Sequence, residues 1–256
     1  MLSLELAIVA FLGLAIGSFL NVVIHRLPRQ QSLVSPGSRC PSCGYALGAA
    51  DNVPVLSYVF LGGRCRKCRT RISVRYPIVE LITASLFVAF YFAFGWTPLL
   101  AVRLLFVAAM IALFAIDLEH HLLPDAITLP GIVVGLVASA FLPPGLISAL
   151  IGTLVGGGVL WAVGEAYYRY SGQEGMGGGD VKMLAMIGAF LGWQQVIVTL
   201  VFSSIAGSVI GLLVIAIKRG GMKHALPYGT FLAIAAVFAS LWGEPLVTWY
   251  AGFYYQ

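Results

Sequence analysis

Four cysteines, all in one polar stretch of the chain, have the spacing of a metal site. They form two Cys-x2-Cys pairs, Cys40/Cys43 and Cys65/Cys68, with 21 residues between the pairs. Two thiols at this spacing can reach one ion, and four thiolates complete a closed tetrahedral zinc site without an open position for water. We therefore predict a structural zinc ion. Two disulfides or four unrelated thiols are the alternatives.

Two aspartates at the ends of apolar runs could act as a catalytic pair. Asp117 follows the run Pro98–Ile116, and Asp180 opens the run Val181–Leu191 after the glycine-rich stretch 175–179. Two carboxylates brought together share a proton, so that one is an acid and the other a base. This chemistry can activate water against an amide. The glycines would permit a bend at Asp180 and a close approach of substrate backbone, although an aspartate at a helix boundary is also a common cap.

The other ionisable residues near apolar runs have plainer interpretations. Asp125 opens an apolar run and is expected to be a helix N-cap. The run Glu119–His121 could hold a metal, but three neighbouring polar residues on a short loop more often face water. Glu80 and Glu165 could be buried or interfacial, and the sequence does not decide between these.

The elements that must position these residues are membrane helices. The chain has 256 residues, of which 60% are hydrophobic and 10% charged, with a mean hydropathy of +0.95. An average soluble domain is about a quarter charged, so a water-soluble enzyme, a disordered chain and a disulfide-rich secreted module are excluded. Spanning a bilayer takes about 20 apolar residues. Eight runs qualify, the sixth being short enough for a half-helix: Leu4–Ile24, Ile78–Gly95, Pro98–Ile116, Ala126–Leu142, Leu146–Tyr168, Val181–Leu191, Gln194–Ile217 and Leu226–Tyr250.

The basic residues predict the orientation of these spans. With eight spans, 14 of the 15 Lys and Arg residues fall on one face, nine of them in the loop His25–Pro77. Basic loops stay in the cytoplasm, where a reducing environment disfavours disulfides between the cysteines. Arg103 alone lies within a span. The first run lacks a cleavage site and is expected to be retained.

The chain resembles the bacterial type IV prepilin peptidases, also called leader peptidase/N-methyltransferases. The likeness covers nearly the whole chain and follows the family's order of motifs. The stretch Gly177-Gly178-Gly179-Asp180 matches the Gly-x-Gly-Asp signature shared with presenilin-like intramembrane aspartyl proteases. The other stretches are 17–28, the cysteine loop with 51–57 and 75–80, 117–125, and 226–233, the last with two departures from the family pattern.

The resemblance implies roles for particular residues. It makes Asp117 and Asp180 the catalytic pair, with Gly177, Gly179 and Lys182 as active-site support. The four-cysteine loop implies a second activity, N-methylation of the new N-terminus with S-adenosylmethionine, although no motif for that donor is visible. The implied substrates are prepilins or pseudopilins, with a basic leader in the cytoplasm and an apolar helix in the bilayer. The basic face suits anionic membrane lipids, and nucleic acid is not an expected partner.

The expected fold is an all-α polytopic protein of the cell (inner) membrane, with about eight transmembrane helices and a cytoplasmic zinc loop between the first two. We predict three parts: a first transmembrane helix at 1–24, the zinc loop or N-methyltransferase part at 25–77, and an aspartyl peptidase bundle at 78–256. A presenilin-like protease of other substrates is one alternative. An ion-coupled transporter is another, but no internal repeat is visible. A docking scaffold would not need eight spans.

Overall fold

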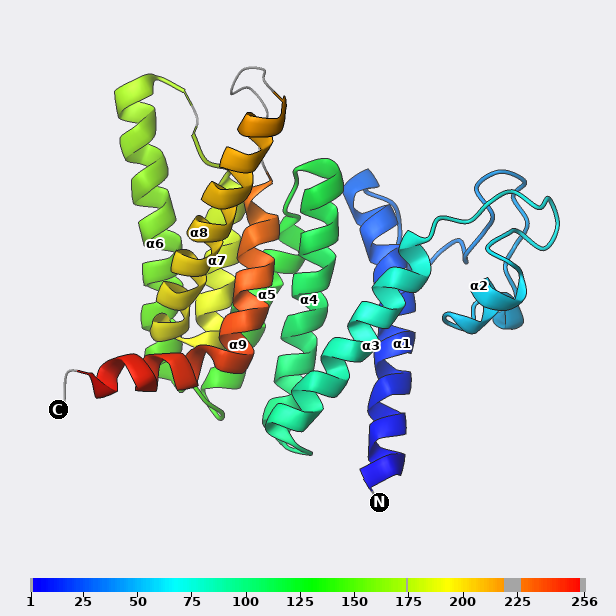
Figure 1. Ribbon diagram of the computed structural model, residues 1–256, viewed down its shortest axis with the longest axis horizontal. Coiled ribbons are helices and arrows are strands. Elements are labelled where there is room, and N and C mark those ends of the chain that lie inside the picture. The colour runs from blue at the N-terminus through cyan, green and yellow to red at the C-terminus, as the bar shows by residue number, and fades with distance from the viewer. Residues whose placement is uncertain (1, 174, 219–226, 254–256) are drawn as a thin grey trace. The chain divides into compact units, whose positions relative to one another are not determined.

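The computed structural model describes residues 2–173, 175–218 and 227–253, and this part of the chain is helical (Figure 1). The predicted all-α fold is confirmed. The α-helices are α1 (Leu2–Arg26), α2 (Leu56–Phe60), α3 (Arg75–Phe94), α4 (Pro98–His120), α5 (Asp125–Ser139), α6 (Leu146–Ser171), α7 (Gly178–Leu191), α8 (Trp193–Lys218) and α9 (Tyr228–Gly252), with short 3-10 turns η1 (Leu27–Arg29) and η2 (Ala49–Asp51). Most of the predicted basic loop 218–224 lies outside the described residues.

Eight long helices lie where the eight apolar runs predicted them, but the count of eight spans is not confirmed. Among the described residues, six helices are long and apolar enough to cross a membrane: α1, α3, α4, α6, α8 and α9. Helix α5 has 15 residues and α7 has 14. At 1.5 Å per residue α7 is about 21 Å long, which is less than the ~30 Å thickness of the hydrocarbon layer.

Residues 2–100 belong to one compact unit, in which α1 packs along α3. Two glycines four residues apart allow the close approach. A Cβ added at Gly13 would lie 2.5 Å from the Cα of Ala84, and one at Gly17 would lie 2.7 Å from the Cα of Glu80. One turn further, the side-chain amide of Asn21 donates to the carbonyl of Tyr76 at 3.0 Å. Small residues at this spacing are typical of helix contacts in membranes.

Residues 101–256 form the second unit, with α7 enclosed by other helices. All nine residues from Met183 to Leu191 are buried, and α7 contacts α5, α6, α8 and α9. Figure 1 shows α7 in yellow between α6 and α5. A helix that is apolar all round is stable only when it is surrounded, so α7 is an internal helix of the bundle and does not face lipid.

Glycines on α6 allow α7 to approach closely. A Cβ at Gly152 would lie 2.7 Å from the carbonyl oxygen of Gly188, and one at Gly156 would lie 2.6 Å from that of Leu184. Both contacts are with backbone, which cannot move aside as a side chain can. The spacing of these glycines therefore sets the distance between α6 and α7.

Side chains of α4 and α5 hold the carboxyl end of α7. Arg103, the basic residue that the charge count left inside a span, is buried and donates to the carbonyl of Phe190 at 3.0 Å. The hydroxyl of Ser139 donates to the carbonyl of Ala189 at 2.9 Å. The last carbonyls of a helix have no partner within it, and these two donors satisfy them inside the bundle.

We expect Gly152→Ala to destabilise the bundle by about 1–3 kcal/mol, the usual effect of overpacking a close contact. Gly158→Ala is the matched control on the same helix, because nothing lies within 4 Å of a Cβ added there. Thermal unfolding in detergent should show a lower melting temperature for Gly152→Ala and an unchanged or higher one for Gly158→Ala. Equal melting temperatures for the two variants would contradict the close α6–α7 contact.

Candidate active site and metal cluster

Asp117 lies in the last turn of α4, where its carboxylate reaches the beginning of α9. Its side chain is buried, and its Oδ2 accepts a hydrogen bond from the backbone N–H of Thr230 at 2.9 Å. A Cβ added at the neighbouring Gly229 would lie 2.8 Å from the same oxygen. The first N–H groups of a helix have no partner within it and attract anions. The amino end of α9 therefore fixes the position of the Asp117 carboxylate.

Asp180 is the third residue of α7 and is half-buried. Gly177 precedes the helix, and a Cβ added there would lie 3.3 Å from Oδ2 of Asp180. The backbone of Gly177 is extended, with φ −72°, and Gly178 and Gly179 have no left-handed φ either. The α-helix begins at Gly178 and continues through Asp180, so the freedom to bend that the glycines would permit is not used at that residue. These glycines leave space beside the Asp180 side chain, and none of them adopts a left-handed φ angle.

Leu123 links the surroundings of the two aspartates. It is buried in the connection between α4 and α5. A Cβ added at Gly179 would lie 2.9 Å from its Cβ, and one at Gly229 would lie 2.9 Å from its Cδ1. Leu123 and Thr230 were not among the predicted site residues. The Leu-Pro pair after α4 was visible, but nothing in it indicated that the side chain fills the space between two glycines.

The structure brings Asp117 and Asp180 together from helices that are far apart in the sequence. Gly179 precedes Asp180, a Cβ added at Gly229 would lie beside Asp117, and both glycines border the same buried side chain, Leu123. Carboxylates that lie close together disfavour the state in which both are charged.

Lys182 of α7 forms an ion pair with Asp125 of α5. The Lys182 amino group lies 2.8 Å from Oδ1 of Asp125, and both side chains are largely exposed. Asp125 is the first residue of α5, while Pro124 occupies the N-cap position, so the predicted capping role is wrong by one residue. An acidic residue in the first turn still interacts favourably with the helix dipole.

The remaining ionisable residues near the helices are now placed. Glu119 and His120 end α4, and with His121 they are exposed, as predicted. Glu165 forms an ion pair with Arg169 at 2.8 Å on α6. Glu80 is buried in α3, where its Oε2 accepts a hydrogen bond from the backbone N–H of Val55 at 2.7 Å.

The four cysteines converge on one point. All four Sγ atoms lie within 4.8 Å of one another, and no other His, Cys, Asp or Glu group in the described residues comes together in this way. The Sγ atoms of Cys40 and Cys68 are 3.7 Å apart, and those of Cys43 and Cys65 are 4.0 Å apart. Sulfurs around a tetrahedral zinc ion are about 3.8 Å apart for Zn–S bonds of about 2.3 Å. All four are free thiols, so the cluster can bind a metal and the disulfide alternative is not borne out.

The two Cys-x2-Cys segments have the same backbone structure. Cys40 N–H donates to the carbonyl of Tyr45, and Cys65 N–H donates to that of Thr70, both at 2.9 Å. Hydrogen bonding with Thr70 lowers the pKa of Cys68 to about 6, whereas burial and the neighbouring thiols raise the pKa of Cys43 to about 11.

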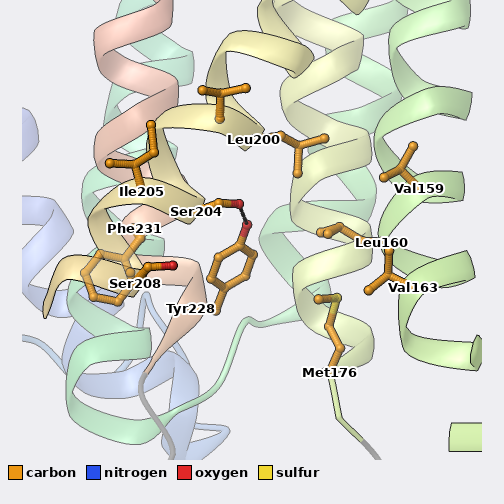
Figure 2. Close-up of a pocket in the computed structure, with 12 residues that line it drawn as sticks. Val159, Leu160, Val163, Met176, Leu200, Ser204, Ile205, Ser208, Tyr228 and Phe231 are labelled. Carbon is orange, nitrogen blue, oxygen red and sulfur yellow. Dashed lines mark hydrogen bonds between the residues drawn. The ribbon is translucent and has the colours of Figure 1, made fainter. Parts of the chain in front are cut away.

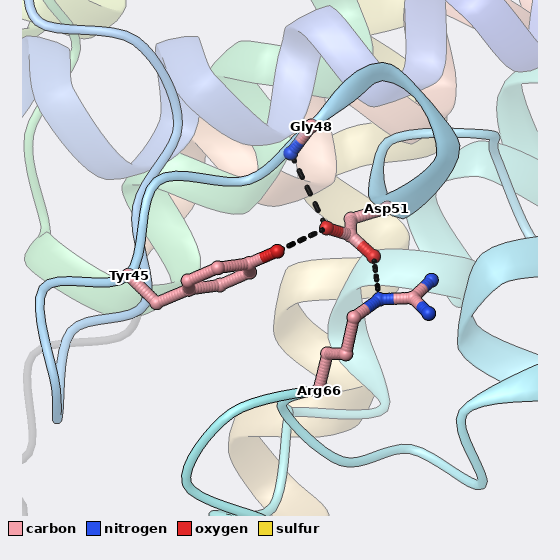
Figure 3. A network of polar contacts seen from close by, with 4 residues as sticks. All are labelled: Tyr45, Gly48, Asp51 and Arg66. Atoms are coloured by element: carbon pink, nitrogen blue, oxygen red, sulfur yellow. Dashed lines mark hydrogen bonds and ion pairs between the residues drawn. The ribbon is translucent and has the colours of Figure 1, made fainter.

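Asp51 connects the two cysteine segments (Figure 3). Its Oδ1 accepts a hydrogen bond from Nε of Arg66 at 2.7 Å, and its Oδ2 accepts from Gly48 N–H at 3.2 Å and from the Tyr45 hydroxyl at 3.4 Å. The hydrogen bond from Arg66 lowers the pKa of Asp51 below its usual value. Tyr45 follows the first pair of cysteines, and Arg66 lies within the second. Because the sequence analysis gave Asp51 no role, this contact was missed.

A helical chain with six candidate membrane spans and two acidic side chains on either side of Leu123 fits a membrane-embedded peptidase. Two family models cover most of the chain: "Bacterial Peptidase A24 N-terminal domain" matches residues 11–94, and "Type IV leader peptidase family" matches residues 104–212. The chain belongs to the type IV leader peptidase family. This membership favours a peptidase over a transporter or a docking scaffold.

Curated relatives named "Prepilin leader peptidase/N-methyltransferase" align along nearly the full chain. The Pseudomonas aeruginosa protein is 39% identical over 94% of this chain and 92% of its own length. The Aeromonas hydrophila protein is 41% identical over 96% and 94%. The Myxococcus xanthus protein is 44% identical over 83% and 64%. No solved structure matches the chain significantly.

We expect Asp51→Asn to weaken metal binding by the cysteine cluster about tenfold, the lower end of the usual effect of residues that support metal ligands. Removing the charge loosens the contact with Arg66 and lets the two cysteine segments separate. Competition with a chromogenic chelator measures the affinity. Arg66→Gln should have a similar effect, whereas Lys67→Gln, an exposed neighbour in the same segment, is the control. Wild-type affinity in Asp51→Asn would contradict the supporting role.

Proposed function

We propose that this chain cleaves the basic leader from type IV prepilins or pseudopilins, with Asp117 and Asp180 as the catalytic pair. The observation that carries the proposal is that Asp117, at the end of α4, and Asp180, at the beginning of α7, lie on either side of the buried Leu123, which borders Gly229 and Gly179 in the peptidase part of the chain. The names of the relatives supply the substrate class.

We place the site at the cytoplasmic face of the inner membrane. The long loop between α1 and α3 holds nine of the 15 Lys and Arg residues, and basic loops stay on the cytoplasmic side. A prepilin has its leader on that side and its apolar helix in the bilayer. The bond between these two parts therefore reaches the membrane surface where the proposed site lies.

The reaction requires one ionised and one protonated carboxyl group. The ionised aspartate removes a proton from water, and the resulting hydroxide attacks the carbonyl carbon of the scissile amide. The protonated aspartate donates its proton to the carbonyl oxygen, which forms a neutral tetrahedral intermediate. When the intermediate collapses, the C–N bond breaks and the leaving nitrogen takes a proton, which yields a carboxyl group on the leader and a free amine on the mature pilin.

Gly177 and Gly179 support this site by leaving space beside it. Each lies within one turn of Asp180, and a side chain at either would press on the Asp180 carboxylate or on Leu123. Lys182 acts indirectly, because its ion pair with Asp125 joins the beginnings of α5 and α7. An exposed pair of this kind contributes at most about 1 kcal/mol.

The second proposed activity is methylation of the new amine, with S-adenosylmethionine supplying an electrophilic methyl group. The second half of the relatives' names supports it. The acidic residues near the cysteine loop do not fit a site for the cationic donor, because Asp51 is paired with Arg66 and Glu80 accepts from Val55. We derive no step through this donor.

We propose zinc as the metal of the cysteine cluster and assign it a structural role. Cys40, Cys43, Cys65 and Cys68 supply four sulfur ligands at suitable separations, and a four-thiolate site leaves no position for water. The ion would hold the two cysteine segments in one folded loop.

The decisive experiment combines both activities. The full chain is purified in detergent and incubated with a prepilin, with and without S-adenosylmethionine, and the mature N-terminus is analysed by mass spectrometry. We expect cleavage in both samples and a mass increase of one methyl group with the donor. An intact prepilin would refute the proposed function, and cleavage elsewhere in its helix would favour a presenilin-like protease.

We expect Asp117→Asn and Asp180→Asn each to lower prepilin cleavage by about 10²–10⁴-fold, because each removes one member of the acid–base pair. Asp125→Ala should retain substantial activity, since it loses only an exposed ion pair. Cleavage rates are normalised to folded protein in membranes. Full activity of Asp180→Asn would contradict the aspartyl mechanism. If Asp125→Ala lost cleavage and Asp117→Asn did not, Asp125 and not Asp117 would be the partner of Asp180.

Freshly purified, reduced protein is expected to contain about one zinc ion per chain, as a closed four-thiolate site requires. Elemental analysis measures it. Cys43→Ser and Cys68→Ser should each lose most of the metal, because a three-thiolate site binds zinc less tightly. Wild-type protein without zinc would overturn this assignment.

Damage to the cysteine cluster should harm methylation more than cleavage. Cys40→Ser and Cys65→Ser loosen a loop between α1 and α3, whereas both proposed catalytic aspartates lie in the second compact unit. The two compact units divide after Leu100, and the predicted parts 25–77 and 78–256, with the separation of activities between them, remain our proposal.

We expect methyl incorporation in these variants to fall about tenfold or more, as for disturbed metal sites, with a smaller loss of cleavage. Both rates are measured on one preparation and normalised to folded protein. Lys67→Gln controls for a change of charge in the loop. Equal losses of the two activities would defeat the proposed separation.

A further inference from the structure

An apolar groove lies between α6, α8 and the beginning of α9 (Figure 2). Its volume is about 770 Å³, within the range of ligand sites. Its walls carry mainly aliphatic and aromatic side chains with two serines, and none of the described residues that line it is charged. At its rim, Val163, Val201 and Ile205 are each about half exposed. Because α6 and α8 are long enough to span the membrane, the groove opens toward the hydrocarbon layer.

Two residues of the groove wall are chain neighbours of the glycines that border the proposed catalytic pair. Met176 lines it and precedes Gly177, where an added Cβ would lie 3.3 Å from Oδ2 of Asp180. Tyr228 also lines it and precedes Gly229, where an added Cβ would lie 2.8 Å from Oδ2 of Asp117. Adjacent Cα atoms are about 3.8 Å apart. The groove wall and the proposed catalytic pair are therefore joined through the consecutive residues Met176–Gly177 and Tyr228–Gly229.

We propose that this groove binds the apolar helix of the substrate, immediately after the scissile bond. The inference rests on the proposed function. When the scissile amide lies between Asp117 and Asp180, the following residues must leave the site along an apolar surface, because they belong to a membrane helix. The groove is such a surface, it adjoins both aspartates, and it opens toward the bilayer from which that helix arrives.

The α8 wall suits a helix as the occupant. Ser204, Gly207 and Ser208 lie three and four residues apart, and therefore on one face of α8. Small residues at this spacing allow a second helix to approach closely. The Tyr228 hydroxyl hydrogen-bonds with the hydroxyls of Ser203 and Ser204, at 3.1 and 3.5 Å. Figure 2 shows the Tyr228 hydroxyl turned toward Ser204, so polar groups of the wall satisfy one another.

A second cavity, of about 530 Å³, does not share this position. It is lined by residues including Pro144, Ser148 and Trp193. Trp193 follows the carboxyl end of α7, whereas Asp180 is at the amino end. Asp180 and Leu191, the last residue of α7, are separated by about 17 Å along the helix, at 1.5 Å per residue. This cavity is too far from the aspartates to receive the residues next to the scissile bond.

The test compares substrates with and without the apolar helix. Wild-type protein in lipid nanodiscs is expected to have a lower KM for a full prepilin than for one truncated shortly after the cleavage site. The KM of the truncated substrate divided by that of the full prepilin measures the contribution of the apolar helix. Ser208→Trp fills the groove and should lower this ratio about tenfold or more, as expected from the lost burial of one or two apolar side chains. Ser208→Leu should have a smaller effect. Leu212→Trp, on an exposed position of α8 outside the groove, should keep the wild-type ratio.

A crosslinking experiment tests the groove without altering its walls. Asp180→Asn protein binds a prepilin that carries a photoreactive phenylalanine derivative in the first turns after the cleavage site. We expect crosslinks to α6 or α8 residues of the groove. The double variant that combines Asp180→Asn with Ser208→Trp should give fewer of them. Crosslinks to other surfaces, or an unchanged KM ratio in Ser208→Trp, would overturn the groove proposal. The proposed function would still stand in that case if the wild-type protein cleaves the prepilin. Crosslinks from a photoreactive phospholipid but not from prepilin would assign the groove to lipid. Absence of wild-type cleavage would overturn both proposals.

Discussion

The enclosure of α7 by glycine-lined neighbours is the constraint on which the peptidase part depends. Nine consecutive residues of this helix are buried, and its backbone touches that of α6 at Gly152 and Gly156. Contacts between backbones leave no freedom for the helix to shift, because carbonyl groups cannot adopt another rotamer. Arg103 and Ser139 hold the other end through the last carbonyls. The depth and rotation of Asp180 in the bundle follow from this packing.

The pairing of the aspartates depends on a second set of close contacts at the opposite end of α7. Leu123 fills the space between Gly179 and Gly229, and the Asp117 carboxylate is held by the N–H of Thr230. Bringing two carboxylates into a buried site costs free energy, which the surrounding packing must offset. A proton shared between them would reduce that cost, and the proposed hydrolysis needs one protonated and one ionised carboxyl group.

The cysteine loop follows a different physical rule. It has little apolar core, and its two halves are joined by the converging thiols and by the Asp51–Arg66 contact. A small loop of this kind depends on metal binding for its folded state. The bundle depends on helix packing, in which each helix satisfies its backbone hydrogen bonds internally. These separate origins of stability are the physical basis for expecting the two proposed activities to respond differently to damage.

Much of this protein was determined by local sequence. Long apolar runs specify helices because no other spanning structure of a single segment satisfies the backbone in lipid, and two Cys-x2-Cys pairs specify a metal site because of thiol chemistry. The resemblance also picked out Asp117 and Asp180. Tertiary structure alone decided that α7 is an internal helix and that Leu123 and Thr230 border the aspartates. It also decided that Asp125 pairs with Lys182 and that Asp51 joins the cysteine segments. Each of these contacts links residues that are distant in the chain. Such contacts depend on how closely backbones and side chains fit together, and residue types and their spacing do not encode that fit locally.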